Sequence, residues 1–358
     1  MLRRLMLVLL CCCALLCAGC NIGIGDRHNV KIGVAMPTQT RQRWNQDGAN
    51  IERMLLDQGY SVNLAYADNK PEVQVGQIDD MIEAGCKVII IACVDANSLG
   101  EVLDKAKDVG TKIISYDRLI MNTDAADYYA TFDSLAVGTF QAEYIEEKLG
   151  LKWGQGSYNI ELFAGAIDDS NAIFLWEGAM DVLRPYIDNG QLVVRSGQTD
   201  LKTTATARWR EEKAEARMTE ILAGYYADAR VDAVLCPNDS TSYGVQKALK
   251  AVGYNLTDKM MPITTGQDAD KKNIPAIMSG EQSMSIFKDT RLLARQTVNM
   301  VNAIIAGKEP ETNDIGNYNN GVKILPTFLV RPQFVDKTNL EEIIFDSGYY
   351  NRSEFFED

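Results

Sequence analysis

The chain has 358 residues, of which 46% are hydrophobic and 24% are charged, and its formal net charge is −13. This length suits two ordinary hydrophobic cores, and the composition is that of a soluble globular protein. Because binding to phosphate backbones needs clustered Lys and Arg, the acidic balance argues against a nucleic-acid partner. A neutral ligand is compatible with this charge.

The N-terminus departs from the soluble composition. Two arginines near the start precede an apolar run over 5–16, and Ala-Gly then comes directly before Cys20. This order predicts a secretory signal peptide over 1–20, which is too short for a membrane-spanning helix. Ala-Gly-Cys resembles a bacterial lipobox, in which the Cys carries the lipid anchor, although Cys17 stands where Leu is usual. An ordinary signal peptide cleaved nearby is the alternative.

We therefore expect a secreted protein, either lipid-anchored to the outer face of the cytoplasmic membrane or free in the periplasm. Residues 21–29 would be a spacer and contain the only histidine, His28. Five of the eight cysteines lie at or before Cys20. The other three, Cys86, Cys93 and Cys236, are too scattered for a disulfide framework or a zinc site, and we expect them to be small buried hydrophobes. No metal and no cofactor are predicted.

From residue 30 the chain alternates short apolar runs with amphipathic stretches. The predicted strands are 31–36, 61–67, 87–93, 112–116 and 128–132, and the predicted helices are 47–58, 73–84 and 99–109. Glycines follow the three helices, where a left-handed cap favours glycine. Strand–helix repetition of this kind predicts a doubly wound parallel sheet.

The same pattern begins again after residue 157. The predicted strands are 158–163, 192–195, 232–236 and 262–265, and the predicted helices are 172–187, 214–227 and 242–252. Two such units predict two similar α/β lobes. Because ligands bind at the carboxyl ends of parallel strands, two facing sheets predict a site in the cleft between the lobes.

Polar side chains gather at the ends of these strands. They are Asp95, Asp117, Arg118, Asp133, Asp168 to Asn171, Asn238, Asp239, Gln267 and Asp268, together with Trp44 and Trp209, each of which follows an arginine. Asp and Asn oxygens accept hydrogen bonds, and Arg and Asn donate them, so the set can match hydroxyl groups that do both. Aromatic rings can stack on the C–H faces of a pyranose. The whole set therefore predicts a polar small-molecule site suited to a sugar.

Some of these carboxylates have a structural alternative. An Asp after a strand is often a helix N-cap, which we favour for Asp239 and weigh equally with a site role for Asp95. The pair Asp168-Asp169 can also be read as the acid and base of a glycosidase. No second motif supports that reading over an N-cap and a ligand contact, so no enzyme is predicted.

Many segments of the chain share one resemblance. They include GVAMPT at 33–38, RW at 43–44, ISYDRL at 114–119, YATFD at 129–133, DDSNA at 168–172, VDAV at 231–234, SGEQ at 279–282, IFKD at 286–289 and VNMVN at 298–302. Through them the chain resembles periplasmic sugar-binding proteins of the type I fold, in the multiple-sugar-binding and xylose-binding branch. The resemblance extends from about residue 30 to residue 350.

The resemblance implies two lobes joined by a three-strand hinge. The N-terminal lobe would comprise 30–133 plus 288–325, the C-terminal lobe 134–287 plus 326–345, and the tail 346–358. The implied sugar-binding residues are Arg43, Trp44, Asp117, Arg118 and Phe132 from the first lobe, Asp169, Asn171, Arg208, Trp209, Asn238 and Asp268 from the second, and Lys288 beside the hinge. Trp209 would stack on one face of the sugar, with Phe132 near the other.

The resemblance also implies a function. The two lobes would close on an aldopentose or aldohexose, and the protein, as a monomer, would deliver it to an ABC permease and its ATPase. A sensor that presents the sugar to a membrane receptor kinase or chemoreceptor is the alternative, since its binding site would be identical. A transcriptional repressor of the same fold would need an N-terminal helix-turn-helix, where this chain has its signal peptide.

Overall fold

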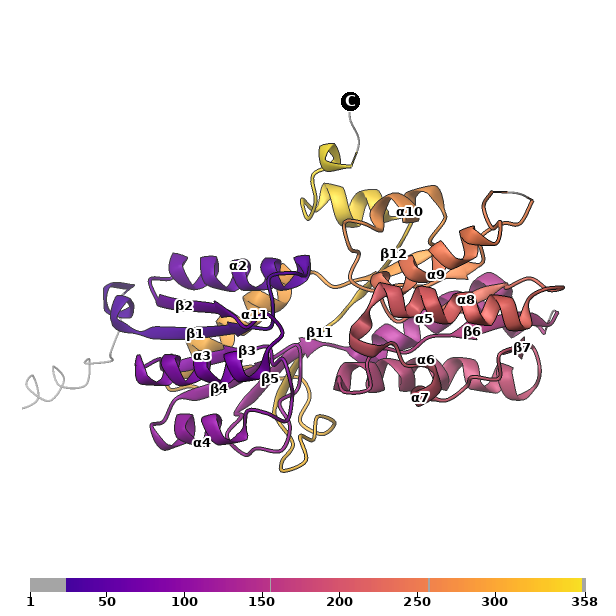
Figure 1. The fold of residues 1–358 in the computed structure, drawn as a ribbon. Helices are drawn as coiled ribbons and strands as arrows, with labels where there is room; N and C mark the ends of the chain where they lie inside the picture. Colours follow the sequence, from indigo (N-terminus) through magenta and orange to yellow (C-terminus); the bar gives the residue numbers. More distant parts are fainter. Residues whose placement is uncertain (1–23, 155, 257, 356–358) are drawn as a thin grey trace, which may run out of the picture.

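The computed structural model of this chain describes residues 24–154, 156–256 and 258–355. Their backbone forms two α/β lobes that lie side by side (Figure 1). The predicted signal peptide and its anchor Cys20 lie outside the described residues.

The first lobe is built on a six-stranded parallel sheet with the strand order β11-β5-β4-β3-β1-β2. Its strands are β1 Lys31–Met36, β2 Ser61–Tyr66, β3 Val88–Ile91, β4 Lys112–Tyr116, β5 Tyr128–Phe132 and β11 Thr327–Val330. Its helices are α2 Gln42–Asp57, α3 Pro71–Glu83, α4 Gly100–Asp108 and α11 Thr290–Ile305, preceded by the 3-10 helix η1 Ile24–Asn29. One apolar cluster lies between the sheet and α2 with α11, and a second lies between the sheet and α3 with α4. The central strand β3 is therefore buried on both faces, as its run of Val and Ile predicts.

The second lobe has a four-stranded parallel sheet with the order β7-β6-β8-β9, and a separate antiparallel pair β10-β12. Its strands are β6 Tyr158–Leu162, β7 Leu192–Val193, β8 Ala233–Leu235, β9 Ile263–Thr264, β10 Met284–Phe287 and β12 Gln333–Asp336. Its α-helices are α5 Ser134–Leu149, α6 Ser170–Asp188, α7 Leu201–Thr204, α8 Glu211–Tyr225, α9 Asp239–Ala251 and α10 Ile274–Ser279. The short helical turns are η2 Leu151–Trp153, η3 Ala207–Trp209, η4 Glu341–Asp346 and η5 Arg352–Glu354. Helices α5 and α6 share one core with the sheet, and α8 and α9 share the other.

Three chain crossings connect the lobes within the described residues: β5 to α5, β10 to α11 and β11 to β12. The predicted boundary at 325 and 326 is wrong. Strand β11 pairs in parallel with β5, with Thr327 opposite Tyr129 and Val330 opposite Phe132, so the chain leaves the first lobe only after Val330. The free edge of β5 provides backbone hydrogen-bonding partners for β11, and the sequence pattern does not reveal this long-range pairing.

Most predicted elements lie where expected, and some differ in length. Strands β1, β4 and β5 have the predicted bounds, whereas β7 and β9 are shorter. Helix α2 begins at Gln42, ahead of the predicted start at residue 47, and its N-cap Arg41 makes no side-chain capping bond that a sequence pattern would reveal. Helix α5, which Asp133 caps by accepting from Ala136 N, was not predicted.

The close packing of α5 against α6 yields a stability prediction. A Cβ at residue 138 would overlap the backbone carbonyl of Leu175, which cannot rotate away. Gly138→Ala should therefore lower the free energy of unfolding by roughly 1–3 kcal/mol, measured by urea denaturation. Gly76→Ala is the control, because Gly76 is an exposed residue of α3 and a Cβ there would have no atom within 4 Å. This substitution should raise the free energy of unfolding by roughly 0.5–1 kcal/mol. Equal effects of the two substitutions would contradict the packing argument.

Candidate functional site

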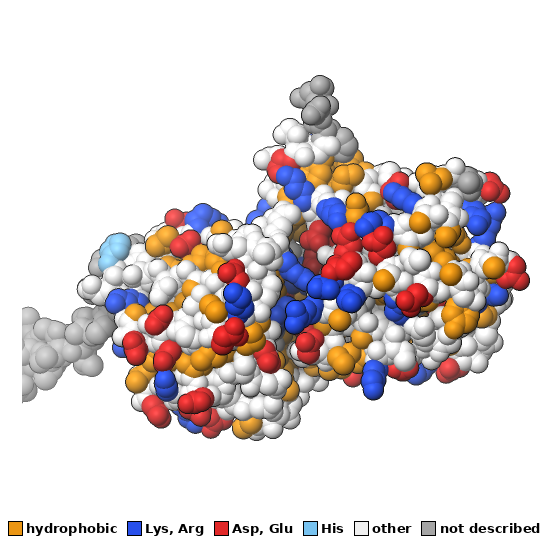
Figure 2. Space-filling view, in the orientation of Figure 1, with side chains coloured by type: hydrophobic (Ala, Val, Ile, Leu, Met, Phe, Trp, Pro, Cys, Tyr) orange, Lys and Arg blue, Asp and Glu red, His pale blue; other side chains and the backbone are white. Residues whose placement is uncertain are grey.

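A cleft with a volume of about 650 Å³ opens between the lobes. It adjoins an inner pocket of about 60 Å³, and Arg41, Arg118, Asp169 and Trp209 line both. Figure 2 shows basic side chains gathered where the two lobes meet. The cleft lies at the carboxyl ends of the strands, as predicted from the parallel sheets.

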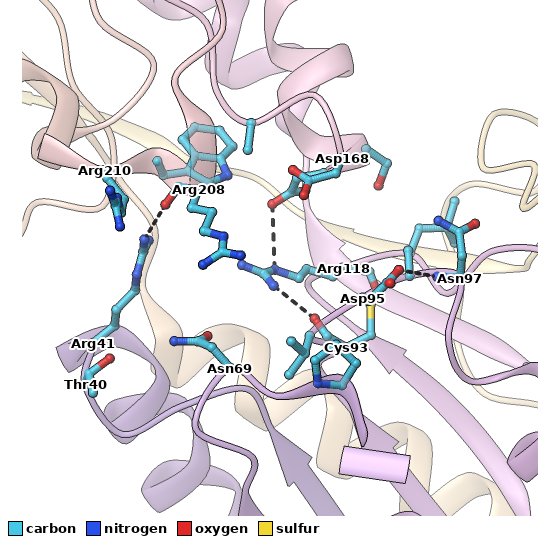
Figure 3. A pocket seen from close by; sticks show the side chains of 18 residues that line it. Thr40, Arg41, Asn69, Cys93, Asp95, Asn97, Arg118, Asp168, Arg208 and Arg210 are labelled. Atoms are coloured by element: carbon cyan, nitrogen blue, oxygen red, sulfur yellow. Dashed lines mark hydrogen bonds and ion pairs between the residues drawn. The ribbon is translucent and has the colours of Figure 1, made fainter. Parts of the chain in front are cut away.

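The inner pocket brings together nearly all the predicted sugar-site residues. Its lining is Arg41, Arg43, Trp44, Asp117, Arg118, Asp169, Asn171, Leu175, Trp209, Asn238, Gln267, Asp268 and Lys288. Of the predicted set only two residues are absent from this lining. Phe132 is buried beneath it, with its ring centroid 5.8 Å from Arg43 Cζ and 5.7 Å from Lys288 Nζ. Arg208 lines the outer cleft instead (Figure 3).

Arg43 is the central cation of the pocket. It lies in the first turn of α2, and its Nε is 3.4 Å from Asp47 Oδ2, one helical turn further on. Its Nη2 donates to Asp117, and its Nη1 lies 3.8 Å from Asp268 Oδ1 on the second lobe. Although burial lowers the pKa of Arg43, these carboxylates outweigh burial and raise it. The guanidinium therefore stays charged and links the two lobes.

Asp117 is a buried carboxylate that stays ionised. Burial opposes its ionisation, but Arg43 and Lys288 outweigh burial and lower the pKa of Asp117. Its backbone carbonyl accepts from Asn171 Nδ2 of the second lobe at 2.7 Å. An ionised carboxylate accepts hydrogen bonds without donating any, so Asp117 can bind a ligand hydroxyl.

Arg118 makes the second charge contact across the cleft. Its Nε lies 3.7 Å from Asp169 Oδ2, and its Nη1 donates to Cys93 O at 3.0 Å (Figure 3). Asp169 is the N-cap of α6 and accepts from Asn171 N at 3.0 Å, so this carboxylate both caps a helix and lines the pocket. Burial raises the pKa of Asp169 and Arg118 opposes that shift.

The prediction that Asp239 caps a helix is wrong. The N-cap of α9 is Asn238, whose Oδ1 accepts from Thr241 N at 3.0 Å and whose amide lines the pocket. Asp239 is the first residue of the helix, fully buried, and accepts from Gln282, Ser285 and Asp270 at 2.7 to 2.8 Å.

Asp95 is not a helix N-cap either. Helix α4 begins at Gly100 after the N-cap Leu99, and the Asp95 carboxylate instead accepts from Asn97 N at 2.8 Å. Asp95 lines the outer cleft together with Asp168. Most of the Asp residues that follow predicted strands therefore do lie at the cleft. The sequence pattern did not show which of them hydrogen-bonds to the backbone of a turn and which caps a helix.

The two tryptophans that line the inner pocket, Trp44 and Trp209, have different surroundings. The guanidinium carbons of Arg43 and Arg118 lie 5.1 and 5.3 Å from the Trp44 ring centroid, so Trp44 orients both arginines. Trp209 packs against Ala166 and Ala172 and lines both the pocket and the outer cleft. A Cβ at Gly165 would overlap its indole, so this glycine makes room for the ring.

Several residues that line the cleft and the inner pocket, and Ala269 next to Asp268, have left-handed backbone conformations. Asp117, Arg208, Trp209, Asp268 and Ala269 have φ values of 60, 54, 56, 95 and 49°. Such conformations are unfavourable for residues with a Cβ and persist where the surrounding structure enforces them. The loops at the strand ends are thus shaped to aim these side chains.

Arg41 is a pocket residue that the sequence analysis did not select. Its Nη2 donates to Arg208 O at 2.7 Å, which adds a hydrogen bond between the lobes (Figure 3). Burial and the neighbouring Arg118 lower the pKa of Arg41. The sequence signal that could have identified Arg41 is its position two residues before Arg43, at the start of the first helix.

The three cysteines in the described part of the chain lie in buried positions, as predicted. Cys86, Cys93 and Cys236 are unpaired and buried in apolar clusters, and burial raises the pKa of Cys93 to about 12. Among the residues that the structure describes, no three His, Cys, Asp or Glu side chains form a group that could hold a metal ion. No helix in the described ranges is long and apolar enough to cross a membrane.

Two α/β lobes, three crossings between them and a polar cleft at their interface define a two-lobed ligand-binding protein. Residues 32–309 match the periplasmic binding protein domain. The chain belongs to the periplasmic binding protein family, and the predicted type I fold is confirmed.

The chain is 50% identical over 319 residues to the multiple sugar-binding periplasmic receptor ChvE of Rhizobium radiobacter, covering 89% of this chain and 90% of that protein. It is 32% identical over 325 residues to the D-xylose-binding periplasmic protein of Escherichia coli K12, covering 91% and 92%. A solved ABC transporter solute binding protein from Clostridium phytofermentans with bound β-D-glucose matches at 52% identity with a TM-score of 0.87, covering 91% of this chain and 100% of that one. Because these relatives are binding proteins, the prediction of a non-enzyme is confirmed.

The environment of Asp47 generates a prediction about pH. Asp47 is fully buried beneath Arg43 and accepts from Tyr116 OH at 2.5 Å, and burial raises the pKa of Asp47 to about 7. In the unfolded chain an Asp titrates near pH ~4, so between these pH values the native state binds more protons than the unfolded state. The contribution of Asp47 to stability is therefore present below pH ~4 and is lost as pH rises towards 7.

Asp47→Asn should remove this dependence. Between pH 5 and 7 the free energy of unfolding of the wild type should fall more steeply than that of the variant, by up to about 1.4 kcal/mol per pH unit. Urea denaturation at pH 5, 6, 7 and 8 measures the difference in slope. Asp57→Asn, an exposed position on the same helix, should follow the wild-type profile. Parallel profiles for wild type and Asp47→Asn would overturn the prediction.

Proposed function

We propose that this chain captures a monosaccharide, an aldopentose or aldohexose, between its lobes and delivers it to an ABC importer. The observation that carries the proposal is the pocket lining, to which the first lobe contributes charged groups and the Trp44 ring, and the second lobe contributes charged and amide groups and the Trp209 ring. Relatives support the same ligand class: one is named for D-xylose, and one solved structure contains β-D-glucose.

The hydrogen-bonding groups of the pocket are of both kinds. Arg43 and Arg118 donate from the first lobe, while Asp169 and Asp268 accept from the second. A sugar hydroxyl donates one hydrogen bond and accepts others, so a ring placed here would meet partners on both sides. Trp209, which lines the pocket, would stack its indole on a C–H face of the ring. A missing hydroxyl would leave a buried partner unpaired, at roughly 1–3 kcal/mol.

Closure of the lobes would follow from this two-sided lining. A ligand that contacts both lobes favours the closed conformation by its differential affinity for that form. Delivery to a permease and its ATPase then needs a docking surface that exists only when the lobes are closed. The sensor alternative uses the same pocket and stays a prediction of the sequence, as does the monomeric state.

Arg43→Ala is the test of sugar binding by this pocket. Removing the guanidinium also takes away the cation that contacts both Asp117 and Asp47. Because hydrogen bonds to charged groups contribute about 1.5–3 kcal/mol, affinity for D-glucose or D-xylose should fall by at least tenfold, measured by isothermal titration calorimetry on protein lacking residues 1–20.

Arg53→Ala is the matched control, since Arg53 lies on the same helix with its side chain 59% exposed. It should leave the affinity within twofold of wild type. If a folded, ligand-free wild type shows no heat and no thermal shift with any monosaccharide, the proposed ligand class is wrong and another small polar ligand occupies the cleft.

We also propose that Cys20 carries the lipid anchor. The support is the sequence Ala-Gly-Cys after the apolar run of the predicted signal peptide. In a bacterial host, the wild type should incorporate labelled palmitate and fractionate with membranes, and Cys20→Ala should do neither. Cys17→Ala, inside the signal peptide, is the control and should keep the label. Labelling that survives Cys20→Ala would disprove the anchor position.

A further inference from the structure

The C-terminal segment over 347–355 reaches across to the first lobe. Tyr349 OH donates to Gln46 Oε1 at 3.2 Å, and Gln42 Nε2 donates to Tyr350 OH at 3.4 Å. Both glutamines lie on α2, and they flank Arg43, the central cation of the pocket.

The same segment is fixed to the second lobe beside Asp268. Tyr350 OH donates to Ala269 O at 3.2 Å, and the Tyr350 side chain is buried in an apolar cluster with Ala269 and residues of α10 and η4. Lys271 Nζ, from the same loop, forms an ion pair with Glu354 at 2.5 Å. The Tyr350 hydroxyl thus bridges helix α2, which carries Arg43, and the loop that carries Asp268.

Tyr349 contacts the hinge crossing that carries Lys288. Its ring meets Phe287 edge-on at a centroid distance of 4.7 Å, and its hydroxyl lies 3.4 Å from Thr290 Oγ1. Arg291 Nη1 donates to Ser347 O at 3.0 Å on the same side. Lys288, between these contacts, pairs with Asp268 at 2.9 Å inside the pocket. The segment therefore packs behind the hinge at the residues that line the site.

We propose that Tyr350, assisted by Tyr349, is a positioning residue that holds α2 at a set distance from the Asp268 loop and so favours the closed arrangement of the lobes. Neither tyrosine lines the pocket, so the effect acts through Arg43 and Asp268. The consequence for affinity rests on the proposed sugar binding, while the effect on lobe distance does not. The apparent affinity for sugar falls in proportion to the population of the closed form. Losing the hydrogen bonds of Tyr350 would therefore weaken binding without removing any ligand contact.

Tyr350→Phe tests this role because it keeps the ring and removes both bridging hydrogen bonds. Spin labels at Asp104→Cys on α4 and Arg184→Cys on α6, both exposed, report the lobe distance without sugar. The native cysteines in the described residues are buried, which favours selective labelling. We expect the short-distance population to shrink and D-glucose affinity to fall roughly three- to tenfold, as the loss of one or two hydrogen bonds allows.

Tyr254→Phe is the matched control. Its hydroxyl accepts from Val231 N at 2.8 Å within the second lobe, so its loss should lower the melting temperature and leave lobe distance and affinity unchanged. Should Tyr350→Phe misfold, Gln42→Ala at an exposed position removes the first-lobe partner and should shift both readouts in the same direction.

The outcomes separate the two proposals. Unchanged lobe distances in sugar-free Tyr350→Phe and Gln42→Ala would overturn the positioning role, even if sugar binds. A changed distance with no sugar binding in the wild type would support the positioning role and refute the proposed function. A lower melting temperature with unchanged distance and affinity would reduce Tyr350 to a packing residue.

Discussion

The placement of one guanidinium between carboxylates of both lobes is the constraint on which the site depends. Arg43 contacts Asp47 and Asp117 of its own lobe and faces Asp268 of the other. A partly buried charge has lost part of its hydration, which is unfavourable. The carboxylates offset this cost only while they surround the guanidinium. Opening the lobes would separate Arg43 from Asp268, and water would have to replace the contact. The pocket is therefore an electrostatic network that is complete when the two walls meet.

The fold supplies these groups from segments far apart in the chain. Parallel strands place their carboxyl ends along one edge, so the loops after β4, β6 and β8 converge on a single cleft. Left-handed conformations at Asp117 and Asp268 then turn side chains inward that a relaxed loop would direct elsewhere. Helix starts add a third element, because Asp169 and Asn238 cap α6 and α9 while lining the pocket. Capping restricts these side chains before a ligand arrives, which reduces the entropy lost on binding.

How much of this was predictable depends on the range of each interaction. Local patterns predicted the strands and the polar residues at their ends, since alternation, glycine caps and apolar runs act over a few residues. The same patterns could not distinguish Asn238 from Asp239 as the cap, because the choice depends on partners such as Gln282 that are distant in sequence. The pairing of β11 with β5 and the contact of Tyr350 with α2 are longer-range still. Nothing near these residues signals where their partners lie.

The balance of charge in the inner pocket bears on the kind of ligand it suits. The cations Arg41, Arg43, Arg118 and Lys288 face the carboxylates Asp117, Asp169 and Asp268, and Asp47 lies beneath Arg43. Lys288 and Arg118 each have a carboxylate partner from the second lobe. A charged ligand would have to displace one of these internal partners and leave it desolvated, which is unfavourable. A neutral molecule rich in hydroxyl groups can instead insert between donors and acceptors while every ion keeps a counter-charge nearby. Because such a ligand would form hydrogen bonds with both lobes at once, the charge balance that stabilises the pocket would also couple ligand binding to the proposed closure of the lobes.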